Sequence, residues 1–310
     1  APGITPARNE HVTDPKNGEL DMLFLFDHVG IDQEGSKWNT VPFEVKNLRA
    51  RLADQQEAVR DAGWASLFFC NHDQPRVVSR WGNDTDRESR ELSAKAFGML
   101  LHMHRGTPYI YEGEELGMTN AHFTRLEQYR DLEAVNAYRQ RVEEAKCQSP
   151  ESMMAALALI GRDNSRTPMQ WDASRYAGFT APDAATEPWI GVNPNHVEIN
   201  AAEEFDDPES VYTFYKKLIA MRHNMPIIAV GDFSPMDAGN DDVIAFQRHL
   251  EDTTIMVICN LSSKKATISE SLRINDNKQQ VLLSNYSTAH AFKSMHDGVL
   301  DPWEAITVQL

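Results

Sequence analysis

Residues 65–76 read ASLFFCNHDQPR, an apolar run that turns abruptly into polar and charged side chains. The near-continuous apolar stretch Ala65–Cys70 is typical of a strand covered on both faces, as in a parallel sheet. Two similar runs, Leu20–Phe26 (LDMLFLF) and Thr107–Tyr111 (TPYIY), predict further strands. Helical patterns separate the three runs, so the sequence predicts a βα domain with three parallel strands.

The helices are predicted from apolar residues at helical spacing and from the residues that begin and end them. Val45–Ala62 carries apolar residues on one side and is stopped by Gly63. Thr85 and Glu88 have the spacing of a capping box and predict the start of another helix. The proline- and aromatic-rich stretch 165–200 predicts a long ordered loop, which in a compact domain is usually functional. Further helices are predicted over Arg125–Lys146, Met153–Ile160 and Pro208–Arg222.

The character of the sequence changes at about Pro226, where short β-rich runs begin, separated by Gly, Asn, Asp and Ser. Such spacing predicts a small antiparallel β-sandwich. The predicted fold class is therefore α/β plus all-β, with a βα domain over residues 1–225 and a sandwich over residues 226–310. The predicted strands of the sandwich are Val243–Gln247, Thr254–Asn260, Ala266–Ile268, Gln280–Leu283 and Ala305–Leu310.

Composition narrows the class of partner. The 30 basic and 46 acidic side chains give a formal net charge of −16, which argues against a nucleic acid or an anionic membrane as partner. The longest apolar run, Met153–Ile160, is far shorter than the ~18 residues of a membrane span. The three cysteines are too far apart to predict a disulfide framework, and no secretory leader opens the sequence. These features predict a cytoplasmic protein.

The strongest local signal for chemistry is Asn71–Arg76, directly after the second predicted strand, where the active sites of parallel barrels lie. A polar loop with helix-capping Asn and Asp is the simpler alternative. Other polar groups at strand ends disfavour it, because aromatic rings and charged groups together suit a neutral, polyhydroxylated ligand. These groups are Tyr109, Tyr111, Glu112, Glu114, Glu115, Arg162, Asp163, Asn164 and Arg166.

No metal or cofactor site is predicted. The sequence holds eleven histidines, but His102 and His104 lie in the helix before the third strand, and no His-x-x-x-His spacing occurs near carboxylates. Asp14–Asn17 (DPKN) is too sparse for a calcium loop.

Taken in order, several stretches resemble the α-amylase family (glycoside hydrolase family 13), and within it the oligo-1,6-glucosidase and α-glucosidase branch. The resemblance runs along the whole chain and is weaker in the predicted sandwich. It implies the C-terminal part of a TIM (β/α)8 barrel followed by a small antiparallel β-sandwich. The matching stretches are Pro2–Thr5, Glu19–Met22, Asn71–Asp84 (NHDQPRVVSRWGND), His104–Asn120 (HRGTPYIYEGEELGMTN), Gly161–Asp172 (GRDNSRTPMQWD) and Ala177–Thr180.

The resemblance also implies roles for five residues. In the family, a retaining reaction uses an Asp nucleophile, a Glu acid/base and a third acid that stabilises the transition state. Asp73 matches the third acid, which clasps the sugar hydroxyls. His72 is expected to donate a hydrogen bond to the terminal glucose, and Arg162 to close the pocket around that glucose. Gln74 and Arg76 are expected on the leaving-group side. The implied substrate is a short α-linked oligosaccharide, cleaved from its non-reducing end.

The sequence departs from the family pattern in one major respect. By the resemblance, the nucleophile Asp and the acid/base Glu precede the segment that starts here at Ala1, and so does the first half of the barrel. We therefore expect a fragment that is inactive alone and whose natural partner is the missing N-terminal half of the barrel. The start at Ala1 rather than Met agrees with a truncated chain.

Two alternatives remain. One is a trehalose-6-phosphate hydrolase, since such relatives share the NHDQPR and RTPMQW segments. The other is a non-catalytic relative that acts as a partner subunit of a membrane transporter, against which stands the joint presence of His72, Asp73 and Arg162. The preference for α-1,6 or α-1,4 linkages depends on residues that this chain does not contain.

Overall fold

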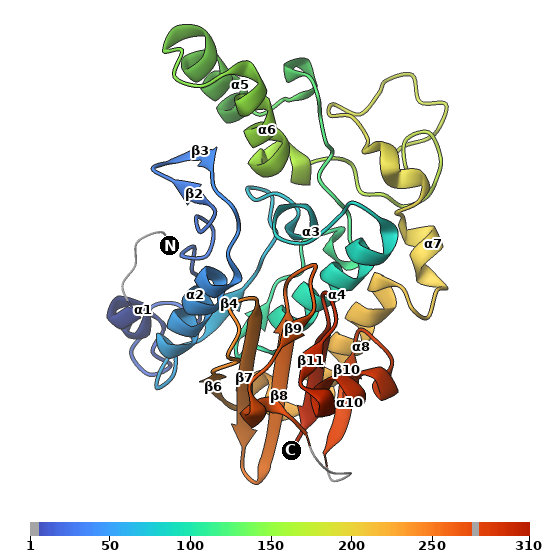
Figure 1. Cartoon of the computed structure of the whole chain (residues 1–310). Coiled ribbons are helices and arrows are strands. Elements are labelled where there is room, and N and C mark those ends of the chain that lie inside the picture. The colour runs from blue at the N-terminus through green and yellow to red at the C-terminus, as the bar shows by residue number, and fades with distance from the viewer. Residues whose placement is uncertain (1–5, 275–278) are drawn as a thin grey trace.

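The computed structural model describes residues 6–274 and 279–310 (Figure 1). Three short parallel strands form one sheet in the order β1-β4-β5. They are β1 (Leu23–Phe24), β4 (Ala65–Leu67) and β5 (Thr107–Pro108). The three parallel strands predicted from the apolar runs are thus confirmed, although each is shorter than its run. Because all three run the same way, the loops that follow them emerge at one edge of the sheet.

Helices pack against this small sheet and bury its apolar side chains. The longest is α4 (Arg87–Met103), which contacts α3 (Val77–Arg80), α8 (Val211–Asn224) and α9 (Pro226–Val230). Helix α1 (Pro6–Thr13) packs on α2 (Val45–Glu57), and α7 (Ala201–Phe205) packs on α8. Helix α4 is buried along most of its length, and Phe97 packs edge-on against Phe69 at a ring distance of 5.7 Å. None of the helices in the described part of the chain is both long and apolar enough to span a membrane.

The start of α4 differs from the prediction. Asp86, not Thr85, is the N-cap, and its carboxylate accepts the N–H of Ser89 at 2.8 Å. Thr85 donates its hydroxyl to Asn83 instead, at 2.7 Å. The predicted capping box is therefore wrong by one residue, because the hydroxyl of Thr85 is bonded to Asn83 in the preceding turn and does not cap the helix.

A separate group of elements lies at the top of Figure 1. It comprises the hairpin β2 (Gln33–Glu34) and β3 (Ser36–Thr40), helix α5 (Leu132–Tyr138) with a π-helical extension (Arg139–Glu144), and α6 (Pro150–Ile160). Trp38 of the hairpin is buried in one cluster with Met153 and Leu157 of α6. The helix predicted over Arg125–Lys146 begins only at Leu132, because Asp131 caps it there. The stretch 165–200 is largely irregular, as predicted, with a 3-10 turn at Pro194–Val197.

The C-terminal part is built on a five-stranded antiparallel sheet with the order β10-β12-β8-β7-β6. The strands β7 (Val243–Leu250), β8 (Thr253–Asn260), β10 (Gln280–Ser284) and β12 (Ala305–Gln309) match predicted runs. The strand β9 (Ala266–Thr267) matches too, but it pairs with the unpredicted β11 (Val299–Leu300) in a separate ribbon. The edge strand β6 (Asp232–Met236), which contains Pro235, and helix α10 (Thr288–Asp297) are also unpredicted.

The antiparallel sheet and the helices around the parallel strands share one apolar core. Phe97 of α4, Phe246 of β7 and Val257 of β8 belong to the same buried cluster. The five-stranded antiparallel sheet begins at Asp232, close to the predicted change at residue 226. The division into domains of residues 1–225 and 226–310 stays a prediction, since a common core joins the two parts.

Candidate active site

The loop that follows β4 presents Asp73 to solvent. Asp73 donates its backbone N–H to the side chain of Asn71 at 2.7 Å, and an isolated bridge pairs Asn71 with Gln74. This tight turn raises the Asp73 carboxylate above the end of the strand, where its side chain remains 44% exposed. A carboxylate fixed by its backbone and still accessible is suited to contact a ligand.

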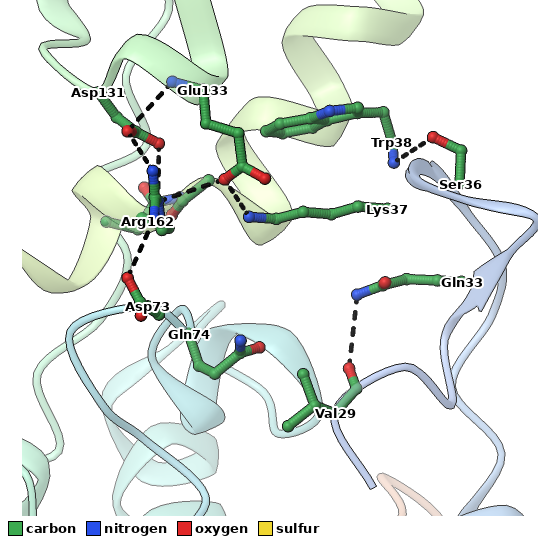
Figure 2. Close-up of polar contacts among 12 residues, drawn as sticks. Val29, Gln33, Ser36, Lys37, Trp38, Asp73, Gln74, Asp131, Glu133 and Arg162 are labelled. Carbon is green, nitrogen blue, oxygen red and sulfur yellow. Dashed lines mark hydrogen bonds and ion pairs between the residues drawn. The ribbon is translucent and has the colours of Figure 1, made fainter. Parts of the chain in front are cut away.

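Two arginines converge on the same oxygen of Asp73. Arg162 Nη1 lies 3.2 Å from Oδ1 (Figure 2). Arg166 Nη2 lies 2.8 Å from the same oxygen, so Oδ2 is left free of both arginines. Both arginines belong to the segment that leaves α6, in which a 3-10 turn (Arg162–Ser165) follows directly on the helix. Arg166 also donates to the backbone carbonyl of His72 at 2.8 Å. The pair therefore fixes both the side chain and the backbone of the loop.

Asp131 holds Arg162 from the other side. It accepts two hydrogen bonds, from Nε at 3.0 Å and from Nη2 at 2.7 Å, which is the strong bidentate geometry. Burial disfavours the charged form of Asp131, but the hydrogen bonds from Arg162 and from the N–H of Glu133 outweigh it and lower its pKa. Hydrogen bonding to Asp131 raises the pKa of Arg162. Both groups are consequently charged, and Arg162 is locked in one orientation.

Hydrogen bonds to the backbone hold the segments that carry Asp73, Asp131 and Arg162 together. The carboxylate of the fully buried Asp163 accepts the N–H groups of Arg130 and Asp131 at 2.6 and 2.8 Å. The hydroxyl of Ser165 donates to the carbonyl of Gln74. The start of α5, the end of α6 and the loop after β4 are thereby fastened to one another.

The β2–β3 hairpin reaches the site from the opposite side. Lys37 Nζ lies 2.7 Å from Glu133 Oε2, and that same oxygen lies 3.2 Å from Arg162 Nε (Figure 2). The chain of charges therefore runs from Asp73 through Arg162 and Glu133 to Lys37. This chain connects the hairpin to the loop after β4.

His72 and Gln74 flank Asp73 in different settings. The His72 side chain is 73% exposed, and its Nε2 lies 3.4 Å from Asp73 Oδ2. Gln74 Oε1 accepts a hydrogen bond from Arg80 at 2.9 Å, and Arg80 in turn pairs with the buried Asp32 at 2.6 Å. His72 is therefore free to meet a ligand, whereas the amide of Gln74 is held by its neighbours.

Arg76 lies below the loop rather than at its surface. It is 1% exposed, donates to the carbonyl of Glu112 at 2.5 Å, and its guanidinium lies over the ring of Tyr111 at 5.2 Å. Its backbone N–H is accepted by Asn120 at 2.9 Å. These contacts make Arg76 a positioning residue for the loops after β4 and β5. Its expected contact with the leaving group stays a prediction, and its burial speaks against direct contact.

A buried carboxyl, Glu114, lies deeper still. It accepts the hydroxyl of Tyr215 at 3.0 Å, while its other oxygen has no hydrogen-bond partner in the described part of the chain. Burial raises the pKa of Glu114 to about 7. Glu114 is only 4% exposed, so it lies beneath the site and does not form part of the surface that a ligand would contact.

The structure thus brings together Asp73, His72 and Arg162, holds Gln74 beside them through Arg80 and Ser165, and sets Arg76 apart. Arg166 was expected among the charged groups at the strand ends, but without a role, and the structure places it on Asp73. Asp131 and Lys37 were not predicted. Asp131 and Lys37 come from distant segments of the sequence, and no local pattern marks them.

The charges at this site balance. Lys37, Arg162 and Arg166 face Asp73, Asp131 and Glu133, which gives three cations and three carboxylates. The stretch 165–200, which begins in the same segment as Arg162 and Arg166, exposes the aromatic side chains Trp171, Phe179 and Trp189. A charge-balanced set of hydrogen-bonding groups suits a neutral ligand rich in hydroxyl groups.

Comparison with known proteins identifies the protein family to which the chain belongs. The alpha-amylase catalytic domain matches residues 4–231, and the chain therefore belongs to this family. The resemblance inferred from the sequence motifs is confirmed.

Particular relatives refine the comparison. An oligo-1,6-glucosidase from Parageobacillus thermoglucosidasius is 42% identical over 98% of this chain, and one from Bacillus cereus is 38% identical over all of it. A trehalose-6-phosphate hydrolase from Bacillus subtilis is 41% identical over 96% of the chain. The chain spans about half the length of these relatives, covering 53%, 54% and 52% of them.

Solved structures show the same similarity in three dimensions. The trehalose-6-phosphate hydrolase of Bacillus licheniformis superimposes with a TM-score of 0.87 at 37% identity. The superposition includes 99% of this chain and 54% of the hydrolase. A variant of the trehalulose synthase MutB gives a TM-score of 0.88 at 35% identity, again with 99% of this chain and 54% of the solved one. The described architecture is therefore the alpha-amylase-like fold.

Proposed function

We propose that the three parallel strands are the C-terminal part of a (β/α)8 barrel, and that the site around Asp73 lies at its catalytic end. The parallel direction of β4 and β5 supports this, since their following loops carry Asp73 and Glu112–Glu115 at one edge. Active sites of such barrels lie at the carboxyl ends of the strands. The rest of the barrel would enclose the ligand from the open side of this sheet.

The proposed activity is that of a retaining α-glucosidase that releases glucose from the non-reducing end of short α-glucosides such as isomalto-oligosaccharides. The observation that carries it is the Asp73 carboxylate, accessible and held by Arg162 and Arg166. A carboxylate fixed in this way can accept two sugar hydroxyls and tighten on them as positive charge develops at the ring. The oligo-1,6-glucosidase relatives support the substrate class.

The division of labour within the reaction follows from the same site. Asp73 stabilises the transition state, His72 donates to a glucose hydroxyl, and Arg162 closes the pocket around that glucose. No residue of this chain matches the family motifs for the nucleophile Asp or the acid/base Glu. We infer that the 310 residues by themselves bind an oligosaccharide without cleaving it, and that turnover requires the complementary half of the barrel.

A trehalose-6-phosphate hydrolase is the second candidate, and similarity to such enzymes at 41% identity favours it. A phosphate, however, requires a cation that is not already neutralised. The three cations of the site are each paired with a carboxylate, so the neutral oligosaccharide remains the preferred substrate.

The test is glucose release by the protein that carries this chain, measured with isomaltotriose, maltose and trehalose 6-phosphate. We expect the fastest release from isomaltotriose, with the α-anomer formed first. The 310-residue polypeptide alone is the control and should release no glucose. Absence of hydrolysis with every α-glucoside in the whole protein would contradict the proposal and favour a non-catalytic relative, whereas preference for trehalose 6-phosphate would favour the second candidate.

A further inference from the structure

The C-terminal part of the chain brings a histidine and two carboxylates together, away from the site around Asp73. His290 lies on α10, Asp301 follows β11, and Glu304 directly precedes β12. His290 Nε2 is 2.9 Å from Asp301 Oδ2 and 3.7 Å from Glu304 Oε1. The three atoms all lie within 4.8 Å of one another, which is the arrangement of a metal-binding cluster.

Glu304 gives this cluster its strongest feature. Its side chain is completely buried, and Oε2 accepts the backbone N–H of Asp301 at 2.7 Å, which fixes the carboxylate. Oε1 faces His290 but has no hydrogen bond of normal geometry among the described residues. Ser294, one turn further along α10, lies beside the carboxylate and can offer its hydroxyl to it. A buried carboxylate oxygen left without a partner is costly, unless a cation satisfies it.

The other two side chains are also oriented by their neighbours. The ring of Tyr286 stacks on His290 at 4.7 Å and 17°, and the tyrosine hydroxyl donates to the carbonyl of Pro302 at 3.0 Å. Asp301 Oδ1 is paired with Lys265 at 2.8 Å, so Oδ2 is the oxygen directed to His290. Contacts of this kind, which hold ligand side chains from outside, are typical of metal centres.

We propose that His290, Asp301 and Glu304 bind one Zn²⁺ ion as a structural site of the C-terminal sheet. One imidazole and two carboxylates form a donor set that zinc uses, with water as the fourth ligand. Tetrahedral zinc with bonds of about 2.0 Å places its ligand atoms about 3.3 Å apart, close to the two separations at His290. The ion would connect α10 with the segment between β11 and β12, and it would satisfy Glu304 Oε1.

The sequence does not reveal this cluster, and the prediction of no metal was made without it. His290 precedes Asp301 by eleven positions, and the residues come from a helix and a connecting segment rather than from one motif. A protonated His290 paired with both carboxylates is the competing arrangement. The two differ in what His290 carries, a metal ion or a proton, and this difference can be measured.

The experiment uses the protein that carries this chain, freed of metal with a chelator and then titrated with Zn²⁺. We expect one tightly bound ion per chain, an increase in melting temperature on its addition, and the visible absorption of a tetrahedral centre when Co²⁺ is used instead. His290→Gln and Glu304→Gln should each lower the affinity about 100-fold or more, since even residues outside the ligand set cost 10–100-fold. His296→Gln, on the exposed face of the same helix, is the matched control and should bind zinc normally.

Thermal unfolding without metal checks that each variant folds. If Glu304→Gln does not fold, His290→Gln still tests the proposal, because His290 is partly exposed and its replacement disturbs the core less. Equal zinc affinity in the original chain and in His290→Gln would overturn the proposal. So would the absence of zinc binding by the original chain.

Discussion

Arg162 is the residue on which the geometry of the candidate site depends. It contacts Asp73, Asp131 and Glu133, and these three carboxylates come from two segments of the chain. A bidentate pair on one side and a single contact on the other fix the guanidinium beside Asp73. The position of Asp73 and the proposed closure of the pocket therefore depend on the same side chain.

Replacement of Arg162 should weaken ligand binding. Arg162→Ala removes the contact that we propose closes the pocket, and we expect KM to rise, more for a disaccharide than for a longer oligosaccharide that has other contacts. The measurement is steady-state kinetics of the whole protein with both substrates. Arg175→Ala, at an exposed arginine that pairs with Glu187 at 3.6 Å and lies over the ring of Tyr176, is the control. An unchanged KM for the disaccharide would count against this role.

The raised pKa of Glu114 predicts that the free energy of unfolding depends on pH. Burial raises its pKa from the ordinary 4.5 to about 7, so the folded chain retains a proton that the unfolded chain loses earlier. The stability linked to this proton is fully present below pH 4.5 and is lost as pH rises to about 7. Glu114→Gln should therefore stabilise the chain relative to wild type above pH 7, by about 3 kcal/mol, and have little effect near pH 4.5.

Urea unfolding at both pH values measures this difference. Glu127→Gln, at an exposed position, should show no such dependence. A pH-independent effect of Glu114→Gln would mean that Glu114 is ionised in the folded chain at neutral pH.

At the scale of the element, the start of α4 offers a direct comparison of the sequence prediction with the structure. Asp86→Ala removes the acceptor for the N–H of Ser89 and should lower the free energy of unfolding. Thr85→Ala removes only a hydrogen bond within the preceding turn and should lower it less. Denaturant unfolding of the two variants provides the measurement. The reverse order would restore Thr85 as the cap.

Elements with a continuous local pattern were predicted well. The strands β4, β7, β8 and β12 follow from apolar runs, because burial on one or both faces leaves a period in the sequence. The strand β6 was missed because Pro235 argues against a central strand, and the structure accommodates it at an edge. Helix α10 was missed because its residues are mostly polar, and only contact with β10 and β11 buries one face of it.

The residues of the candidate site likewise fall into those that a sequence motif revealed and those that only the folded chain brings together. Asp73, His72 and Arg162 lie in motifs that are continuous in sequence and were found there. Lys37 and Asp131 join them only through folding, because a hairpin and a helix N-terminus from distant segments meet at the site. Contacts of that kind leave no local signal, and a structure is needed to see them.

At the scale of the molecule, Arg248 connects the antiparallel sheet to the helices. It is fully buried on β7 and donates to the carbonyls of Met103, Ile228 and Gly231 at 2.7, 2.6 and 2.5 Å. Burial lowers its pKa to about 9, so it remains charged at neutral pH. The guanidinium thus satisfies the ends of α4 and α9 at the surface where the two parts of the chain meet.

Arg248→Met should therefore destabilise the whole chain. Loss of the donors leaves several buried carbonyls unpaired, which should cost about 3 kcal/mol or more. Urea unfolding gives the value, and Arg51→Met, at an exposed position on α2, is the control. Because one apolar core spans both parts, we expect a single unfolding transition in each protein. Two separate transitions in the unmodified chain would contradict a shared core.

The central claim is that Asp73 stabilises the transition state of glycoside hydrolysis. Asp73→Asn keeps the shape of the side chain and removes its charge, and the most direct measurement is kcat for glucose release from isomaltose by the protein that carries this chain. Asp61→Asn, at an exposed position in the turn before β4, is the matched control. We predict that Asp73→Asn lowers kcat by several powers of ten with an unchanged melting temperature. Turnover equal to that of the Asp61→Asn control would contradict the account.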